Sequence, residues 1–254
     1  MMRTRITLFG TLLAAATTLW AAEFWEKKEY TEWSKNECEH LLEKSPWSLQ
    51  YTETNFYAPA TNISSGSETL TPGQQAAGLE PQSGERESRI TFYFTLLTAK
   101  PVRMAEGRLA LLRSPEMKEK VEAFISQPVG DEIIFRLLYG SQPPGNSMLH
   151  DIHNYFRRAT INDFQSDTIL TSSETKVPVH IIRYEPPDDK RAFALLVFPR
   201  RDAGGQPFFT GQEKNITLRG EFNIPIAQRG GPRKFSVFVK MEPKKMRFQG
   251  EFAL

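Results

Sequence analysis

Two histidines three residues apart, His150 and His153, are the residues whose type and spacing best suit chemistry. On a helix they share a face, and two imidazoles at this spacing can hold a metal ion when a third ligand comes from elsewhere. Asp151 lies between them, and Arg157 follows a turn later. A solvent-facing polar stripe opposite Ile152 explains the same pattern more simply. We therefore predict no metal site, and the pair supports only an alternative function, metal-assisted hydrolysis.

Other common catalytic patterns are missing from the sequence. It contains no G-x-S-x-G elbow, H-E-x-x-H pair, Walker loop or G-x-G-x-x-G turn. The single cysteine, Cys38, excludes an intramolecular disulfide, and we expect it on the apolar stripe of a helix. His40 and His180 have no motif around them. The sequence therefore predicts no catalytic residue and no cofactor.

The chain begins with the pattern of a signal peptide. Residues 1–22 carry two arginines near the start, then an uncharged, largely apolar run over Ile6–Trp20, then small residues. This run is short for a membrane span but suits a signal peptide, and we favour cleavage after Ala21 over cleavage after Ala22. We therefore expect a bacterial protein that is exported to the periplasm or secreted, with no transmembrane span after signal removal.

The composition is that of an ordinary globular protein. Among the 254 residues, 39% are hydrophobic and 24% charged, which argues against a disordered, collagen-like or multi-span membrane protein. Removing residues 1–21 leaves 30 basic and 30 acidic residues. With no overall charge excess, nucleic acid is not an expected partner.

A short helix is predicted over residues 35–44. Ser34 and Glu37 have the spacing of a capping box, and Trp33 and Cys38 have the spacing of a hydrophobic staple. Pro46 is incompatible with continuing the helix. Trp33 belongs to a group of three nearby tryptophans, the others being Trp25 and Trp47. They suit either an aromatic binding platform or packing of this helix onto a sheet, and we favour packing.

The same opening carries a resemblance to a family. The pattern F-W-E-K-K, then W-S-x-x-E-x-x-x-L-L-x-x-S-P-W, resembles the start of a group of uncharacterised exported proteins of soil bacteria. The end of the chain is also similar, through Phe238, Lys240, Met241, Met246, Phe248 and Gly250. The resemblance implies export and no particular activity.

The middle of the chain alternates predicted strands and helices. Strands are expected over residues 48–57, 89–98, 131–139, 177–184 and 192–198, and helices over residues 101–112, 115–125 and 147–158. The first of these helices has its apolar stripe at Val102, Ala105, Leu109 and Leu112, and Ser114 and Pro115 fit the start of the second. Residues 58–88 are rich in small and polar residues and predict a flexible loop. We expect one domain over residues 22–254 that contains this loop.

Three C-terminal segments show alternating apolar and polar residues. They start at Ile216, Phe235 and Met246, and the sequence EPKK between the last two suits a tight hairpin. This pattern predicts an antiparallel meander with one buried face. The fold class expected is therefore α+β: an antiparallel sheet of about six to eight strands, with helices mainly in the N-terminal half.

Residues 212–254 are locally basic, with nine lysines and arginines against four glutamates. They suit either an anionic partner such as a cell-envelope polymer, or a solvated sheet face with charged loops, and we favour the solvated face. The function expected is that of a non-catalytic envelope or secreted protein with a binding or structural role. The alternative is an exported hydrolase, metal-assisted through His150 and His153.

Overall fold

The structure is a computed structural model whose described residues are 24–57, 87–142, 144, 147–175, 177–226 and 231–254. The predicted signal peptide lies outside them, and so does most of the predicted loop over residues 58–88. Glu87 and Ser88, which the prediction placed in that loop, instead begin a strand. The α+β class is confirmed, with antiparallel sheets and with helices largely in the N-terminal half.

The first helical elements are α1 (Phe24–Lys27), the 3-10 turn η1 (Tyr30–Glu32) and α2 (Lys35–Lys44). The predicted helix is confirmed, and so is its capping box. The Ser34 backbone N–H donates to the Glu37 carboxylate at 2.8 Å, and the Glu37 backbone N–H donates to the Ser34 hydroxyl at 3.3 Å. Trp33 and Cys38 are fully buried beside this start. Local side-chain chemistry therefore fixes where α2 begins.

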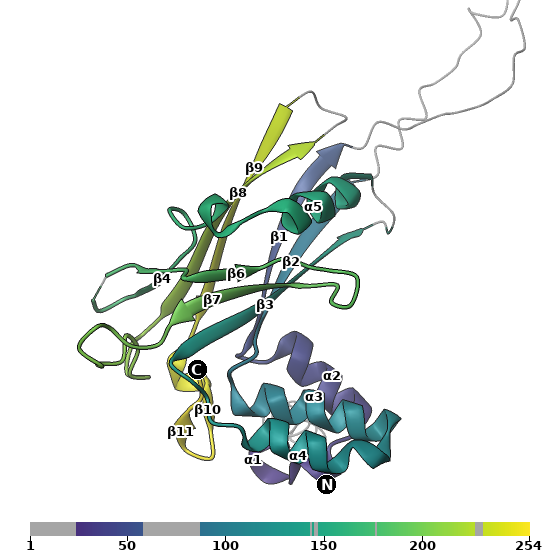
Figure 1. Cartoon of the computed structure of the whole chain (residues 1–254), viewed down its shortest axis with the longest axis vertical. Helices are drawn as coiled ribbons and strands as arrows, with labels where there is room; N and C mark the ends of the chain where they lie inside the picture. Colours follow the sequence, from purple (N-terminus) through teal and green to yellow (C-terminus); the bar gives the residue numbers. More distant parts are fainter. Residues whose placement is uncertain (1–23, 58–86, 143, 145–146, 176, 227–230) are drawn as a thin grey trace, which may run out of the picture.

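The helical layer is completed by α3 (Lys100–Arg113), the 3-10 turn η2 (Pro115–Met117) and α4 (Lys118–Ser126). At Gly107 a Cβ atom would lie 2.7 Å from Cγ1 of Val121, so a glycine is needed for α3 and α4 to pack this closely. Figure 1 shows these helices grouped at one end of the strands.

Two details of the helix prediction are wrong. Leu112 was expected on the apolar stripe of α3, yet it is 44% exposed. The last buried residue of α3 is Gly107, so the C-terminal turn of this helix lies outside the core. Ser114 was expected to cap a helix, but a 3-10 turn follows it and its side chain makes no capping bond.

The larger sheet has five antiparallel strands in the order β1-β2-β3-β7-β6. They are β1 (Ser48–Tyr57), β2 (Glu87–Leu96), β3 (Glu132–Gln142), β6 (Arg183–Glu185) and β7 (Ala194–Pro199). The smaller sheet has four strands in the order β5-β4-β8-β9. They are β4 (Ile169–Ser172), β5 (Val179–His180), β8 (Ile216–Ile226) and β9 (Gly231–Met241).

The predicted strand over residues 177–184 is in fact two strands. β5 pairs with β4 in the smaller sheet, whereas β6 pairs with β7 in the larger one. Between them, at Ile181 and Ile182, the chain crosses from one sheet to the other. A chain that passes between packed sheets does so at a bend or bulge, which here interrupts the strand.

The core lies between the two sheets, which contact each other through aromatic rings. Phe92 of β2 lies 5.7 Å from Phe222 of β8 and 5.4 Å from Phe235 of β9, measured between ring centroids. The predicted helix over residues 147–158 is confirmed as α5 (Ser147–Arg158), and its Phe156 contacts both Phe92 and Phe222. After α5 the chain makes the 3-10 turn η3 (Ile161–Asp163). Buried residues of the helical layer and both sheets form one hydrophobic cluster.

The third segment of the predicted meander does not join the sheet. After the 3-10 turn η5 (Pro243–Lys245), which replaces the expected tight hairpin, β10 (Arg247–Phe248) and β11 (Glu251–Phe252) pair only with each other. Gln249 and Gly250 have φ angles of +52° and +80°, and they reverse the chain between these strands. The Trp47 indole donates to the backbone oxygen of Ala253 at 2.6 Å, so this C-terminal hairpin is held against the start of β1.

Among the described residues, no helix has both the length and the apolar character needed to cross a bilayer.

Candidate basic cleft

The two histidines singled out by the sequence lie on α5 but do different things. His150 is exposed, whereas His153 is half-buried and its Nδ1 lies 2.8 Å from the hydroxyl of Tyr139 on β3. This hydrogen bond helps to dock α5 onto the larger sheet. Within the described ranges, no group of three or more His, Cys, Asp or Glu residues is placed to hold a metal ion. The part of the chain that the structure describes therefore brings no third such ligand to this pair.

Cys38 is the one thiol in the sequence, and it is fully buried. Burial raises its pKa to about 11, so it stays a protonated thiol near neutral pH. The three tryptophans are also buried, with 7% of Trp25 and none of Trp33 or Trp47 exposed. The packing interpretation of these side chains is confirmed.

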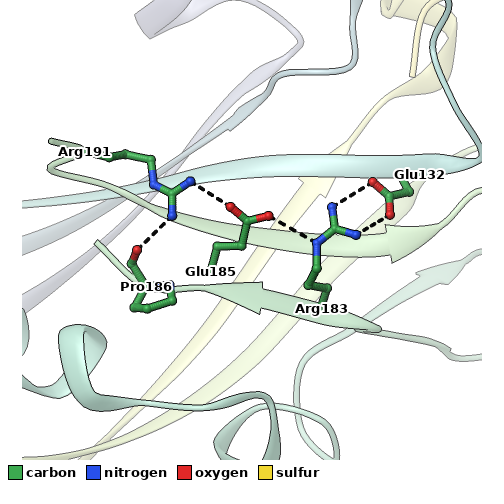
Figure 2. A network of polar contacts seen from close by, with 5 residues as sticks. All are labelled: Glu132, Arg183, Glu185, Pro186 and Arg191. Carbon is green, nitrogen blue, oxygen red and sulfur yellow. Dashed lines mark hydrogen bonds and ion pairs between the residues drawn. The ribbon is translucent and has the colours of Figure 1, made fainter. Parts of the chain in front are cut away.

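One group of charged side chains forms a network of ion pairs and hydrogen bonds among its own members (Figure 2). Arg183 on β6 donates through two nitrogens to Glu132 on β3 at 2.5 and 2.9 Å, and through Nε to Glu185 at 3.2 Å. Arg191 donates to Glu185 at 2.7 Å and to the Pro186 carbonyl at 3.0 Å. We call these residues the paired network. It reaches across β7 and ties the edge strand β6 to β3, which is a structural role.

A cleft of about 820 Å³ opens where α2 meets the C-terminal hairpin. Figure 1 places both elements at the same end of the molecule. Lys44 comes from the last turn of α2, and four more cations come from β9, η5 and β10: Lys240, Lys244, Lys245 and Arg247. Pro46 and Leu49 supply partly exposed apolar surface, and the nearly buried Trp25 and Met241 lie behind it. We call this the basic cleft.

The basic cleft has more positive than negative groups. Its five Lys and Arg side chains face two carboxylates, Glu26 and Glu242, an excess of three positive charges. Lys245 pairs with Glu242 at 3.0 Å, and the Glu26 carboxylate accepts from the backbone N–H of Gln249 at 3.0 and 3.1 Å. Lys44 and Lys244 are exposed and have no ion pair among the described residues. Their charges are therefore available to a ligand.

His40, one of the residues that line the basic cleft, has a buried ring nitrogen without a partner among the described residues. His40 lies four residues before Lys44 on α2, and its Nδ1 is buried with no hydrogen bond from the part of the chain that the structure describes. A buried unsatisfied polar atom costs roughly 1–3 kcal/mol.

Sequence reasoning identified only part of this site. Four of the nine basic residues in the 212–254 segment line the cleft, and three of them, Lys240, Lys244 and Lys245, are exposed, as the solvated-face interpretation expects. Arg229 lies outside the described residues. Lys44 and His40 carried no signal in the sequence, because nothing in their spacing shows that α2 meets the C-terminal hairpin.

A second hollow, of about 560 Å³, lies between α5 and the far end of β8 and β9. Its charged residues are Arg158, Asp151 and Asp163, so its charges nearly balance. The Asp163 carboxylate is already engaged, since it accepts from the Thr160 backbone N–H at 2.7 Å and from the Thr160 hydroxyl at 2.9 Å. The basic cleft is therefore the better candidate site.

Compared with known proteins, the chain matches no family model, no curated protein and no solved structure at a significant level.

Proposed function

We propose that this chain is an exported, non-catalytic binding protein that holds an anionic ligand in the basic cleft. The observation that carries the proposal is the excess of three positive charges there, with Lys44 and Lys244 lacking carboxylate partners among the described residues. A concave, one-signed surface concentrates ligands of opposite charge. The apolar surface beside these cations adds contact area that a free surface lysine lacks.

Export is the second part of the proposal and rests on the signal-peptide pattern of the sequence. Periplasmic or secreted protein of the natural host should begin near Ala22 or Glu23, as measured by intact mass. Material that retains residues 1–20 would contradict a cleaved signal peptide.

The binding proposal is tested by calorimetric titration with two anions of different chemistry, trigalacturonate and tripolyphosphate. Maltotriose serves as the uncharged comparison. We expect saturable binding of at least one anion and none of maltotriose. The double variant Lys44→Gln/Lys244→Gln should bind that anion about tenfold more weakly, corresponding to about 1.4 kcal/mol.

The matched control is Lys190→Gln/Lys214→Gln, which removes the same formal charge from exposed loop residues that do not line the cleft. The control should keep at least half of the wild-type affinity. Equal losses in both double variants would mean that overall charge rather than the cleft binds the anion. If neither anion binds, the proposal fails.

The hydrolase alternative through His150 and His153 stays a hypothesis from the sequence. Within the described ranges, no group of three or more metal-ligating side chains forms around this pair.

A further inference from the structure

An exposed aromatic side chain lies on β9, beside the basic cleft. Phe238 points away from the core and is 48% exposed, whereas its neighbours Val237 and Val239 are buried. Two cations lie over its ring. The guanidinium of Arg219, which is opposite Phe238 in the β8–β9 ladder, is 5.8 Å from the ring centroid, and Nζ of Lys240 is 5.4 Å from it. Cation–π attraction holds both charges close to the ring.

This cationic strip, defined as Arg219, Phe238 and Lys240, continues directly from the basic cleft. Lys240 belongs to both, because it lines the cleft and also contacts Phe238. On the other side, Arg219 and Phe238 line a shallow hollow of about 250 Å³ on the outward face of β8 and β9. Outward residues on one strand repeat every ~6.7 Å. The strip therefore connects the two hollows. A ligand that contacts both must be longer than one small anion.

The carboxylates along this path indicate what kind of anion fits. Glu26 and Glu242 line the cleft, and Asp167 and Glu221 line the shallow hollow. An ionised carboxylate has about four acceptor positions, so one already engaged can still accept hydrogen bonds from hydroxyl groups. A ligand with both negative charges and hydroxyl groups satisfies both kinds of side chain. A polyphosphate backbone offers no hydroxyl donors to them.

We propose that the ligand of the basic cleft is an acidic polysaccharide whose chain extends over Lys240 to Phe238 and Arg219. This inference rests on the proposed function and goes further by naming the ligand class. Single-stranded nucleic acid is less suited, because its non-specific binding uses a series of aromatic platforms. Here one ring is exposed on the strip, and two cations already lie over it.

The test compares galacturonate oligomers of three and ten residues by calorimetric titration of the full chain. The variants are Phe238→Ala and Arg219→Gln, and the matched control is Phe124→Ala, which removes a ring that is 41% exposed on α4. A decamer has more binding registers than a trimer, and this statistical gain is the same in every protein. The readout is therefore the decamer-to-trimer affinity ratio of each variant relative to that of wild type.

We expect the ratio to fall by at least about fivefold in Phe238→Ala and in Arg219→Gln, because each loses contacts that only the longer chain reaches. Phe124→Ala should keep the wild-type ratio. If Phe238→Ala and Arg219→Gln both keep the wild-type decamer-to-trimer affinity ratio, the proposal that the ligand extends over the cationic strip is wrong. If the trimer binds and depends on Lys44 and Lys244, the proposed function would stand even then.

A thymidine decanucleotide provides the competing chemistry at comparable charge. Tighter binding of this probe than of the decagalacturonate, with a loss in Phe238→Ala, would overturn the polysaccharide assignment in favour of nucleic acid. Unfolding midpoints of all variants should match wild type within about 2 °C, since these side chains are exposed and surface substitutions usually have small effects.

Discussion

The paired network and the basic cleft both concentrate charged side chains, yet they differ in how those charges are matched. In the network, Arg183 contacts two carboxylates and Arg191 contacts one, with distances of 2.5–3.2 Å. In the cleft, Lys44 and Lys244 have no such partner in the described part of the chain. Matched charges tie a strand to its sheet, whereas unmatched charges leave interaction energy for a ligand. The number of charged residues alone would not distinguish the two regions.

A third group of charged side chains, an ion pair, lies closer to the interior. Arg136 of β3 donates to Glu106 of α3 at 2.5 Å, and these side chains are only 15% and 28% exposed. This pair joins the helical layer to the larger sheet. Burial raises the pKa of Glu106, since the charged carboxylate loses hydration there. Here the ion pair with Arg136 is what allows Glu106 to be charged while it is largely buried.

The largest effect is expected for Arg136→Leu. Breaking a buried ion pair costs roughly 3–5 kcal/mol. Because Glu106 keeps part of its side chain in water, we expect a loss of about 2–3 kcal/mol in the free energy of unfolding at pH 7. Urea denaturation measures it.

The double variant Arg136→Leu/Glu106→Leu should recover most of that loss, because no charge remains buried. The deficit of Arg136→Leu should also shrink toward pH 4. A carboxyl with a raised folded-state pKa binds its proton more readily when folded, so its ionisation lowers stability as pH rises above about 4.5. A deficit that is independent of pH would mean that Arg136 acts through packing alone.

A smaller difference in the free energy of unfolding is expected between variants of the paired network and of the basic cleft. Arg183→Gln should lower the free energy of unfolding by about 1 kcal/mol, since its ion pairs are partly exposed and such pairs are individually weak. Lys244→Gln should change it by less than about 0.5 kcal/mol, because the ammonium has no carboxylate partner to lose. Thermal unfolding at fixed low salt compares the two variants. Equal losses would remove the distinction between matched and unmatched charges.

The smallest effect is expected on how steeply the stability falls at acidic pH. Hydrogen bonds from Arg191, together with those from Arg183, hold the pKa of Glu185 below its usual range. The unfolded chain therefore binds this proton more readily, and the stability from Glu185 is lost as pH falls below about 4.5. Glu185→Gln should make the decline in stability between pH 5 and pH 3 less steep. Glu119→Gln, an exposed change on α4, should leave the slope unaltered.

Local chemistry was enough to determine several elements from the sequence. The boundaries of α2 follow from a capping box and from Pro46, and both act within a few residues of the helix end. The alternation in β8 and β9 likewise predicts which residues are buried, since Phe235 and Val237 face the core and Ser236 does not. These features depend on short-range hydrogen bonds and on side-chain periodicity.

Only the tertiary structure decided the rest. The last apolar segment buries Met246 and Phe248 as its pattern suggests, yet it does so in a separate hairpin, because alternation specifies a face and not a pairing partner. The basic cleft is the clearest case. Lys44 and Lys244 are 200 positions apart in the sequence, and they line one surface because Trp47 binds the Ala253 carbonyl and holds the C-terminal hairpin beside α2. Such long-range packing has no signature in residue spacing, so the sequence supplied the charges and the fold decided which of them meet.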